Sequence, residues 1–253
     1  MYIVALHNLN EDKQNRAGEL SAALGVTNYE ALSRLRAPGS GPFVLAVFAA
    51  KEEAERLEGR LRAAGFDVLA LGPGELEAEA DQRFVRRFEL GGEALKVETT
   101  AGESLAVSYH HMDLIVRGIG ITSSTSTETR KEKQFDLATA VMSNGLKMMK
   151  TVKTTREVTR EEREGFFNLY AGAGPTLAFY ETGLAYDGLG PSRALSRSAN
   201  LLQLIAELRR RCPGARYDDR LLNKAGVSAL LGPRLNPEEH LVIATALLAK
   251  GLR

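Results

Sequence analysis

The chain has 253 residues, of which 44% are hydrophobic and 26% are charged, a composition that argues against a largely disordered protein. Its net charge of +1 argues against nucleic-acid binding through the charge of the whole chain, and its single cysteine excludes an internal disulfide. No apolar run approaches the roughly 20 residues that span a bilayer, and the first residues lack the basic region of a signal peptide. We therefore expect a cytoplasmic protein, of one large domain or, as we prefer, two.

The first 72 residues are predicted to form a small domain in which strands and helices alternate. Residues 51–64 place Ala54, Leu57, Leu61 and Ala64 at helical spacing with charges between them, so one apolar stripe can pack on a sheet. Gly65 then ends the helix, because the left-handed backbone usual after a helix costs glycine least. Apolar patterning and glycine or proline breaks predict the remaining elements: strands at 2–9, 43–49 and 66–71, and helices at 10–24 and 28–36.

This order, together with KEEAE at 51–55, Leu57, Leu61, the AAG at 63–65 and Val68, resembles the C-terminal domain of the bacterial ribosomal stalk protein. The Clp protease adaptor is similar in fold. The resemblance covers under a third of the chain and implies a βααβαβ sandwich. It also implies that the start of the second helix binds protein partners, which in the stalk family are translation factors.

In and just before that second helix, Gly25, Glu30 and Ala31 match the stalk family, whereas Tyr29 and Leu32 stand where the family carries lysines. Residues 1–72 hold eight basic and nine acidic residues, a net charge of −1, so no electropositive docking face is evident. We expect the fold to be kept with a different partner. The predicted protein-binding residues are Tyr29, Leu32 and Arg36.

Residues 73–82 form the predicted linker. The segment GPGELEAEADQ at 72–82 joins a Pro/Gly turn to four acids, Glu75, Glu77, Glu79 and Asp81. We interpret these acids as a solvated tether on a short helix or coil, and a specific basic partner as the less probable alternative.

Residues 83–216 are predicted to form an antiparallel β domain. Seven short strands in a meander are expected at 84–90, 94–99, 104–108, 112–117, 166–170, 176–180 and 184–186. A helix at 196–211, with Ser198 able to cap its start, should cover the sheet. Seven strands closed by one helix resemble the pleckstrin-homology superfold, and a general antiparallel sheet with a covering helix is the alternative. The fold class is thus α+β, and fold at this level does not fix function.

Residues 122–164 lack strand character and are predicted to be an insertion in that domain. A methionine-containing basic segment could contact an anionic membrane or enter a partner's groove. The alternative, which we favour slightly, is a long twisted hairpin in which Met149, Val152 and Thr154 face neighbouring strands. The candidate anion or membrane contacts are Lys147, Lys150, Lys153, Arg156 and Arg160.

Residues 217–253 are predicted to be a helical tail, with helices at 217–231 and 236–252. Asn236 should cap the second helix, Pro237 should lie in its first turn, and its apolar face should dock within the chain. A homodimer could equally bury the tail and the insertion.

Two features that suggest chemistry have simpler explanations. His110 and His111 adjoin Asp113, but neighbouring residues of a strand point to opposite faces, so a shared metal ion is not expected. Cys212 follows three arginines that should lower its pKa, but no histidine is near in sequence. We therefore expect no catalytic residue, metal or cofactor, and nucleic acid is not an expected partner. The predicted function is a non-enzymatic protein-binding adaptor or regulatory protein, and the alternative is peripheral association with an anionic membrane.

Overall fold

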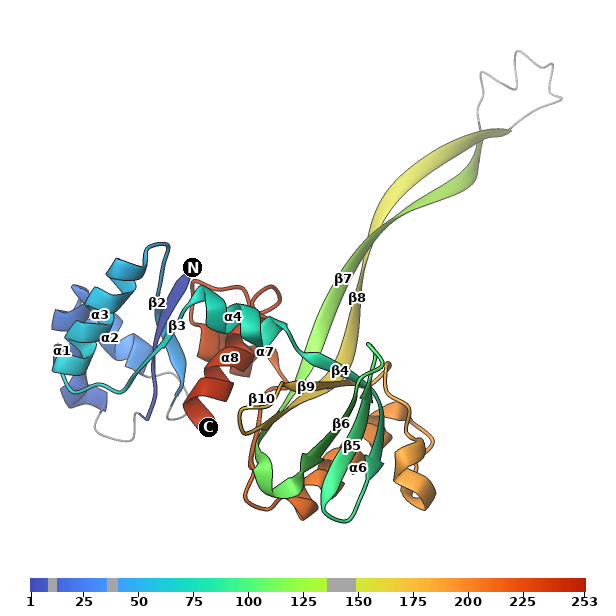
Figure 1. Cartoon of the computed structure of the whole chain (residues 1–253). Helices are drawn as coiled ribbons and strands as arrows, with labels where there is room; N and C mark the ends of the chain where they lie inside the picture. The colour runs from blue at the N-terminus through green and yellow to red at the C-terminus, as the bar shows by residue number, and fades with distance from the viewer. Residues whose placement is uncertain (9–12, 36–40, 136–148) are drawn as a thin grey trace. The chain divides into compact units, whose positions relative to one another are not determined.

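A computed structural model describes the backbone of residues 1–8, 13–35, 41–135 and 149–253. It also describes the side chains of these residues, except those of residues 13–15, 80 and 121–162. The fold is mixed α/β, with one sheet of three strands and one of seven (Figure 1). The chain divides into two compact units, residues 1–120 with 164–253, and residues 121–163. The predicted domain boundaries at 72 and 82 stay predictions.

The three-stranded sheet belongs to the first 72 residues. The order of strands and helices predicted for these residues is confirmed. β1 (Tyr2–Leu6) pairs antiparallel with β2 and with β3, which gives the order β2-β1-β3. Ala54, Leu57 and Leu61 are buried as predicted, and Gly65 has a φ of 75°. The other elements are α1 (Lys13–Leu24), α2 (Asn28–Leu35), β2 (Phe43–Phe48), α3 (Lys51–Ala63) and β3 (Val68–Leu71).

The segment predicted to be an acidic tether is a helix, α4 (Pro73–Ala80). The Glu75 side chain accepts a hydrogen bond from the backbone of Gly72 at the start of this helix and pairs with Lys250. Glu79 is only 7% exposed, so the interpretation of these acids as solvated is wrong for this residue. The physical reason is that Leu76 and Glu79, three residues apart, share the helix face that packs inward.

The seven-stranded sheet has the order β10-β7-β8-β9-β4-β5-β6. Six of the predicted strands are present, but the predicted simple meander is wrong because β9 lies parallel to β4. The strand bounds are β4 (Arg83–Leu90), β5 (Ala94–Thr99), β6 (Ser104–Ser108), β7 (Met112–Phe135), β8 (Met149–Ala171), β9 (Leu177–Tyr180) and β10 (Arg216–Leu221).

The seventh strand is not the predicted one. Residues 184–186 are not a strand, although Leu184 and Tyr186 are buried. The seventh strand is β10, in a segment predicted to be helical, and it pairs parallel with β7. Only Leu221 of β10 is fully buried. Because the rest of this strand at the end of the sheet order is mostly polar, its sequence lacks the alternating apolar pattern that predicts a strand.

The predicted insertion has strand character in its described part, so the prediction that it lacks strands is wrong. β7 and β8 run through residues 121–135 and 149–163 as neighbours in the sheet order and form a long hairpin (Figure 1). The backbone thus agrees with the hairpin alternative. Residues 136–148 lie outside the described residues.

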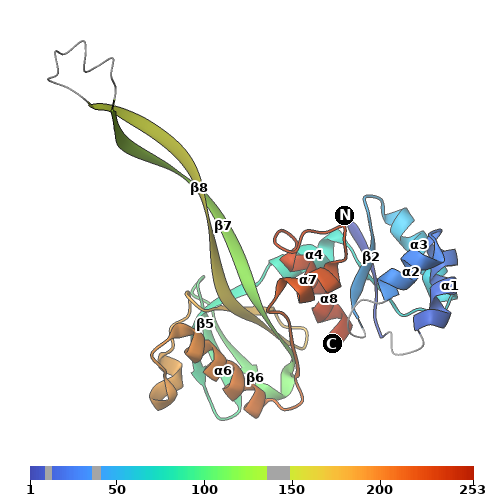
Figure 2. The same cartoon turned by 180° about the vertical axis from the view of Figure 1, so that it is seen from behind.

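α6 (Arg197–Arg211) lies beside β5 and β6 in both views (Figure 1 and Figure 2), and its Leu201, Leu204 and Leu208 pack with residues of β4 and β5 in one hydrophobic cluster. The helix is capped by Ser196, whose hydroxyl accepts from the Ala199 N–H, and not by Ser198. Among the described residues, no helix is both long and apolar enough to cross a membrane.

The C-terminal tail contains α7 (Lys224–Leu231) and α8 (Leu241–Leu252). The second tail helix therefore starts five residues later than predicted, and Pro237 lies in the turn before it. Asn236 does not cap that helix, because its side-chain oxygen accepts from the Glu238 N–H within this turn. As predicted, the apolar face of α8 docks within the chain, in a cluster that also contains residues of β1, β3, β7 and β8.

Candidate functional site

The candidate site is a hollow of about 640 Å³ between α4, α8 and the loop that joins β8 to β9. Its volume lies in the usual range of small-molecule sites. Each wall comes from an element described above: Ala78 and Glu79 from α4, Ala246 and Ala249 from α8, and Tyr170 from the end of β8.

Glu79 is the central side chain of this hollow. Its Oε1 atom accepts a hydrogen bond from the Tyr170 hydroxyl at 2.5 Å and one from the Gln82 amide at 3.2 Å. Thr245 of α8 is buried beside the same carboxyl, and its hydroxyl donates to the Val242 carbonyl at 2.9 Å. All three of these side chains are neutral.

Burial determines the ionisation of this pair. Removal from water is the largest effect on Glu79 and raises the pKa of its carboxyl, while the neighbouring polar groups of Tyr170, Thr245 and Gln82 oppose the rise. Burial, and then the charge of Glu79, raise the pKa of Tyr170 far above its usual value. The phenol therefore stays protonated at physiological pH and acts as a hydrogen-bond donor to Glu79.

The ionisation of Glu79 should make the stability depend on pH. A folded-state pKa above the ordinary value of 4.5 means that the folded chain holds this proton more tightly than the unfolded chain does. The contribution of Glu79 is therefore fully favourable below about 4.5 and is lost as the pH rises through its folded pKa. We expect Glu79→Gln to flatten this part of the pH dependence, because the amide oxygen can still accept from Tyr170 and carries no charge.

Thermal unfolding of the wild type and of Glu79→Gln between pH 4 and pH 8 measures this effect. The variant should gain stability relative to the wild type as the pH rises. Glu77→Gln is the matched control, since Glu77 is exposed on the same helix. A constant difference between wild type and Glu79→Gln over this range would contradict the prediction.

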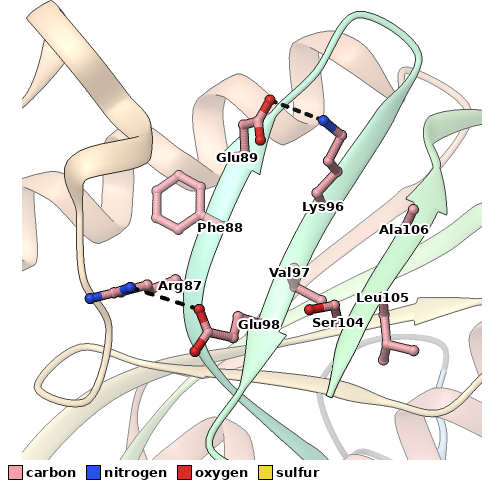
Figure 3. A pocket seen from close by; sticks show the side chains of 9 residues that line it. All are labelled: Arg87, Phe88, Glu89, Lys96, Val97, Glu98, Ser104, Leu105 and Ala106. Carbon is pink, nitrogen blue, oxygen red and sulfur yellow. Dashed lines mark hydrogen bonds and ion pairs between the residues drawn. The ribbon is translucent and has the colours of Figure 1, made fainter. Parts of the chain in front are cut away.

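A second, open hollow of about 370 Å³ lies over β4, β5 and β6 (Figure 3). Its charged side chains pair across the strands, Lys96 with Glu89 at 3.2 Å and Arg87 with Glu98 at 3.9 Å. Surface pairs of this kind contribute little stability. The pairing leaves the hollow without a dominant charge. A partner would therefore meet a concave surface beside an exposed strand rather than reactive side chains.

Of the predicted protein-binding residues, Tyr29 and Leu32 lie on α2, and they line neither hollow. Tyr29 is 79% exposed, and Leu32 packs partly against the core of the first sheet. Arg36 lies outside the described residues, as does Lys147. Lys150, Lys153, Arg156 and Arg160 are on β8, but their side chains are not described, so contact with an anionic membrane stays a prediction.

His110 and His111 belong to a short 3-10 turn (Tyr109–His111), and the described residues contain no group of side chains placed to hold a metal ion. Asp113 instead accepts from the Gly172 backbone and pairs with Arg253. Cys212 is buried, and burial raises the pKa of its thiol, so the expected lowering by the arginines is wrong. Those arginines point elsewhere; Arg210 and Arg211, for example, pair with Glu207.

Sequence reasoning missed Glu79 and Tyr170 as partners because they lie 91 residues apart. One local signal was present, since Glu79 follows Leu76 at helical spacing. Comparison of the chain with protein-family models, with curated proteins and with solved structures finds no match in any of the three.

Proposed function

We propose that the protein is a non-enzymatic protein-binding adaptor or regulatory protein, and that it binds an extended peptide segment along the edge of β6. The observation that carries this proposal is that the hydrogen-bonded strand order of the described residues ends at β6. A strand at the edge of a sheet presents unpaired N–H and C=O groups, and addition of a partner's strand is a common mode of peptide recognition.

The register identifies which groups of β6 are free. The Thr99 N–H donates to the Glu103 carbonyl at 2.9 Å, and Lys96 lies opposite Ala106 in the same antiparallel ladder. Bonded and non-bonded pairs alternate along such a ladder, so the Ala106 pair is non-bonded and the N–H and C=O of Ala106 point to the outer edge. The same alternation applies to Ser104 and Ser108.

The surroundings of this edge suit a peptide. Ser104 and Ala106 are small and exposed, so a second backbone can approach closely. The hollow over β4, β5 and β6 is lined by both residues and lies beside the edge, where it can accept a side chain of the added segment (Figure 3). Pockets for alternate side chains give this mode its specificity.

The two resemblances extend the proposal. A stalk-like sandwich for residues 1–72 is supported by the order of its elements and would present Tyr29 to a second partner. A pleckstrin-like domain is supported by six strands followed by α6, although the parallel pairing of β9 with β4 departs from a simple meander. The hairpin of residues 121–163, a compact unit of its own, would be a further surface for protein contact.

The test is Ala106→Pro in the full chain. Proline removes the outward N–H and is tolerated on edge strands, so the bonds between β5 and β6 should persist. Peptides selected from a random 12-residue library by the wild type should bind the variant at least about tenfold more weakly, a loss of about 1.4 kcal/mol.

Ala106→Ser is the matched control, because it keeps both the N–H and a small side chain at this position. It should bind the selected peptides as the wild type does, and circular dichroism should show the same fold for all three proteins. Unchanged binding to Ala106→Pro, or no selected peptide at all, would overturn the proposal for this edge.

A further inference from the structure

Glu79 is the single Asp, Glu, Lys or Arg among the buried residues of the described chain. A buried carboxylate is costly unless an opposite charge or several strong donors compensate it. No described residue forms an ion pair with Glu79, and its hydrogen-bond partners are neutral. The carboxyl nevertheless lines a hollow that is open to a small molecule.

The other charges of the hollow cannot supply the missing partner without breaking existing pairs. The charge of Arg253 favours the ionised form of Glu79, but its guanidinium already donates to Asp113 and to the Gly172 carbonyl. The remaining charged side chains of the lining are paired with each other: Glu75 with Lys250, and Asp81 with Arg83 at 3.0 Å.

The shape of the hollow limits the body of a ligand. Its walls include Ala78, Ala246 and Ala249, and the loop adds Ala173 and Gly174. These small side chains leave room for a short aliphatic chain, while the Arg253 guanidinium already lies over the Tyr170 ring, 5.8 Å from its centre.

We propose that this hollow is a binding site for an organic cation, a primary ammonium group on a short aliphatic chain, with Glu79 as its counter-ion. The ammonium donates to the Glu79 carboxylate, which is a charge-assisted hydrogen bond stronger than one between neutral groups. The aliphatic chain lies against the alanines. A carboxyl that is protonated before binding releases its proton to solvent, while the ammonium keeps its three protons.

The choice of a cation follows from the charge balance. Apart from Glu79, the described lining has two acids and three bases: Glu75, Asp81, Arg83, Lys250 and Arg253. Arg253 pairs with Asp113, which lies outside the lining. One negative charge is thus left over when Glu79 ionises. An anion would add to it, and a neutral alcohol would leave it uncompensated.

The probe is n-butylamine, which is an ammonium ion at neutral pH, and n-butanol is its uncharged isostere. Titration of the isotope-labelled full chain, followed by NMR, should give saturable shifts for residues of α4, α8 and the loop 172–176. Affinity for n-butylamine should exceed that for n-butanol at least about tenfold, and it should rise with pH as Glu79 ionises, with uptake of protons by the buffer. Equal affinity for the two probes would show an apolar hollow only and would overturn the proposal.

Three variants locate the site. Glu79→Gln should weaken n-butylamine binding at least about tenfold and abolish the proton release, whereas Glu77→Gln, with the same change of charge on an exposed residue of α4, should leave both unchanged. Ala78→Phe adds bulk from an exposed lining position and should block binding while Glu79 and the core are kept. Wild-type affinity in Glu79→Gln or in Ala78→Phe, or no saturable binding to the wild type, would refute the assignment.

Discussion

Leu247→Ala should lower the free energy of unfolding by about 2–5 kcal/mol, the usual range for removing a buried leucine side chain and leaving a cavity. Leu247 of α8 is 0% exposed and belongs to the cluster that also contains Ile3 and Leu71 of the three-stranded sheet and Leu114 and Tyr170 of the seven-stranded sheet. A cavity at this position therefore removes contacts that both sheets share.

Urea unfolding measures this loss, with circular dichroism for the whole chain and tyrosine fluorescence as a second probe. Leu202→Ala is the control, because Leu202 lies on α6 and is 44% exposed, so the same truncation there should cost about 0.5 kcal/mol or less. Coincident transitions by the two probes would indicate that the cluster couples the sheets in one cooperative unit. Equal effects of the two substitutions would contradict the packing of α8.

Gly226→Ala is expected to destabilise the fold by about 1–3 kcal/mol or more, the range for forcing extra volume into a packed region. A Cβ atom at Gly226 would overlap the Arg220 carbonyl oxygen and lie 2.9 Å from the carbonyl carbon. Arg220 cannot move away easily, because its guanidinium donates to Asp218 at 2.8 Å and to the Gly41 carbonyl at 2.7 Å.

Gly59→Ala provides the contrast, since nothing lies within 4 Å of a Cβ atom at this position in the middle of α3. There the substitution should stabilise the protein by about 0.5–1 kcal/mol, because alanine has the higher helix propensity. Thermal unfolding of the two variants should therefore shift in opposite directions. A neutral result for Gly226→Ala would show that the turn between β10 and α7 can relax around the methyl group.

Local patterns were sufficient where one element supplied both the signal and the structure. The stripe of Ala54, Leu57 and Leu61 and the stop at Gly65 predict α3 because helical spacing and backbone preference act within a few residues. The same holds for α6, whose leucines share one face, although its cap was placed at Ser198 instead of Ser196.

Long-range pairing was not predictable from these patterns. β10 is mostly polar, and it is a strand because β7 offers a partner backbone, so the helix predicted across it was wrong. The parallel approach of β9 to β4 likewise depends on the path of the whole chain, whereas strand count and order alone suggested a meander. For the same reason, the free edge of β6 is a property of the assembled sheet.

The sequence by itself determined a mixed α/β chain, the elements of its first 71 residues and a tail that docks within the chain, because these follow from apolar periodicity and helix stops. Only the tertiary structure decided that Glu79 is buried and that Tyr170, 91 residues away, donates to it. An exposed acid and a buried one look alike in a sequence. Their difference in solvation, which sets the pKa of Glu79 and the charge it offers to a ligand, arises when α4, α8 and β8 meet.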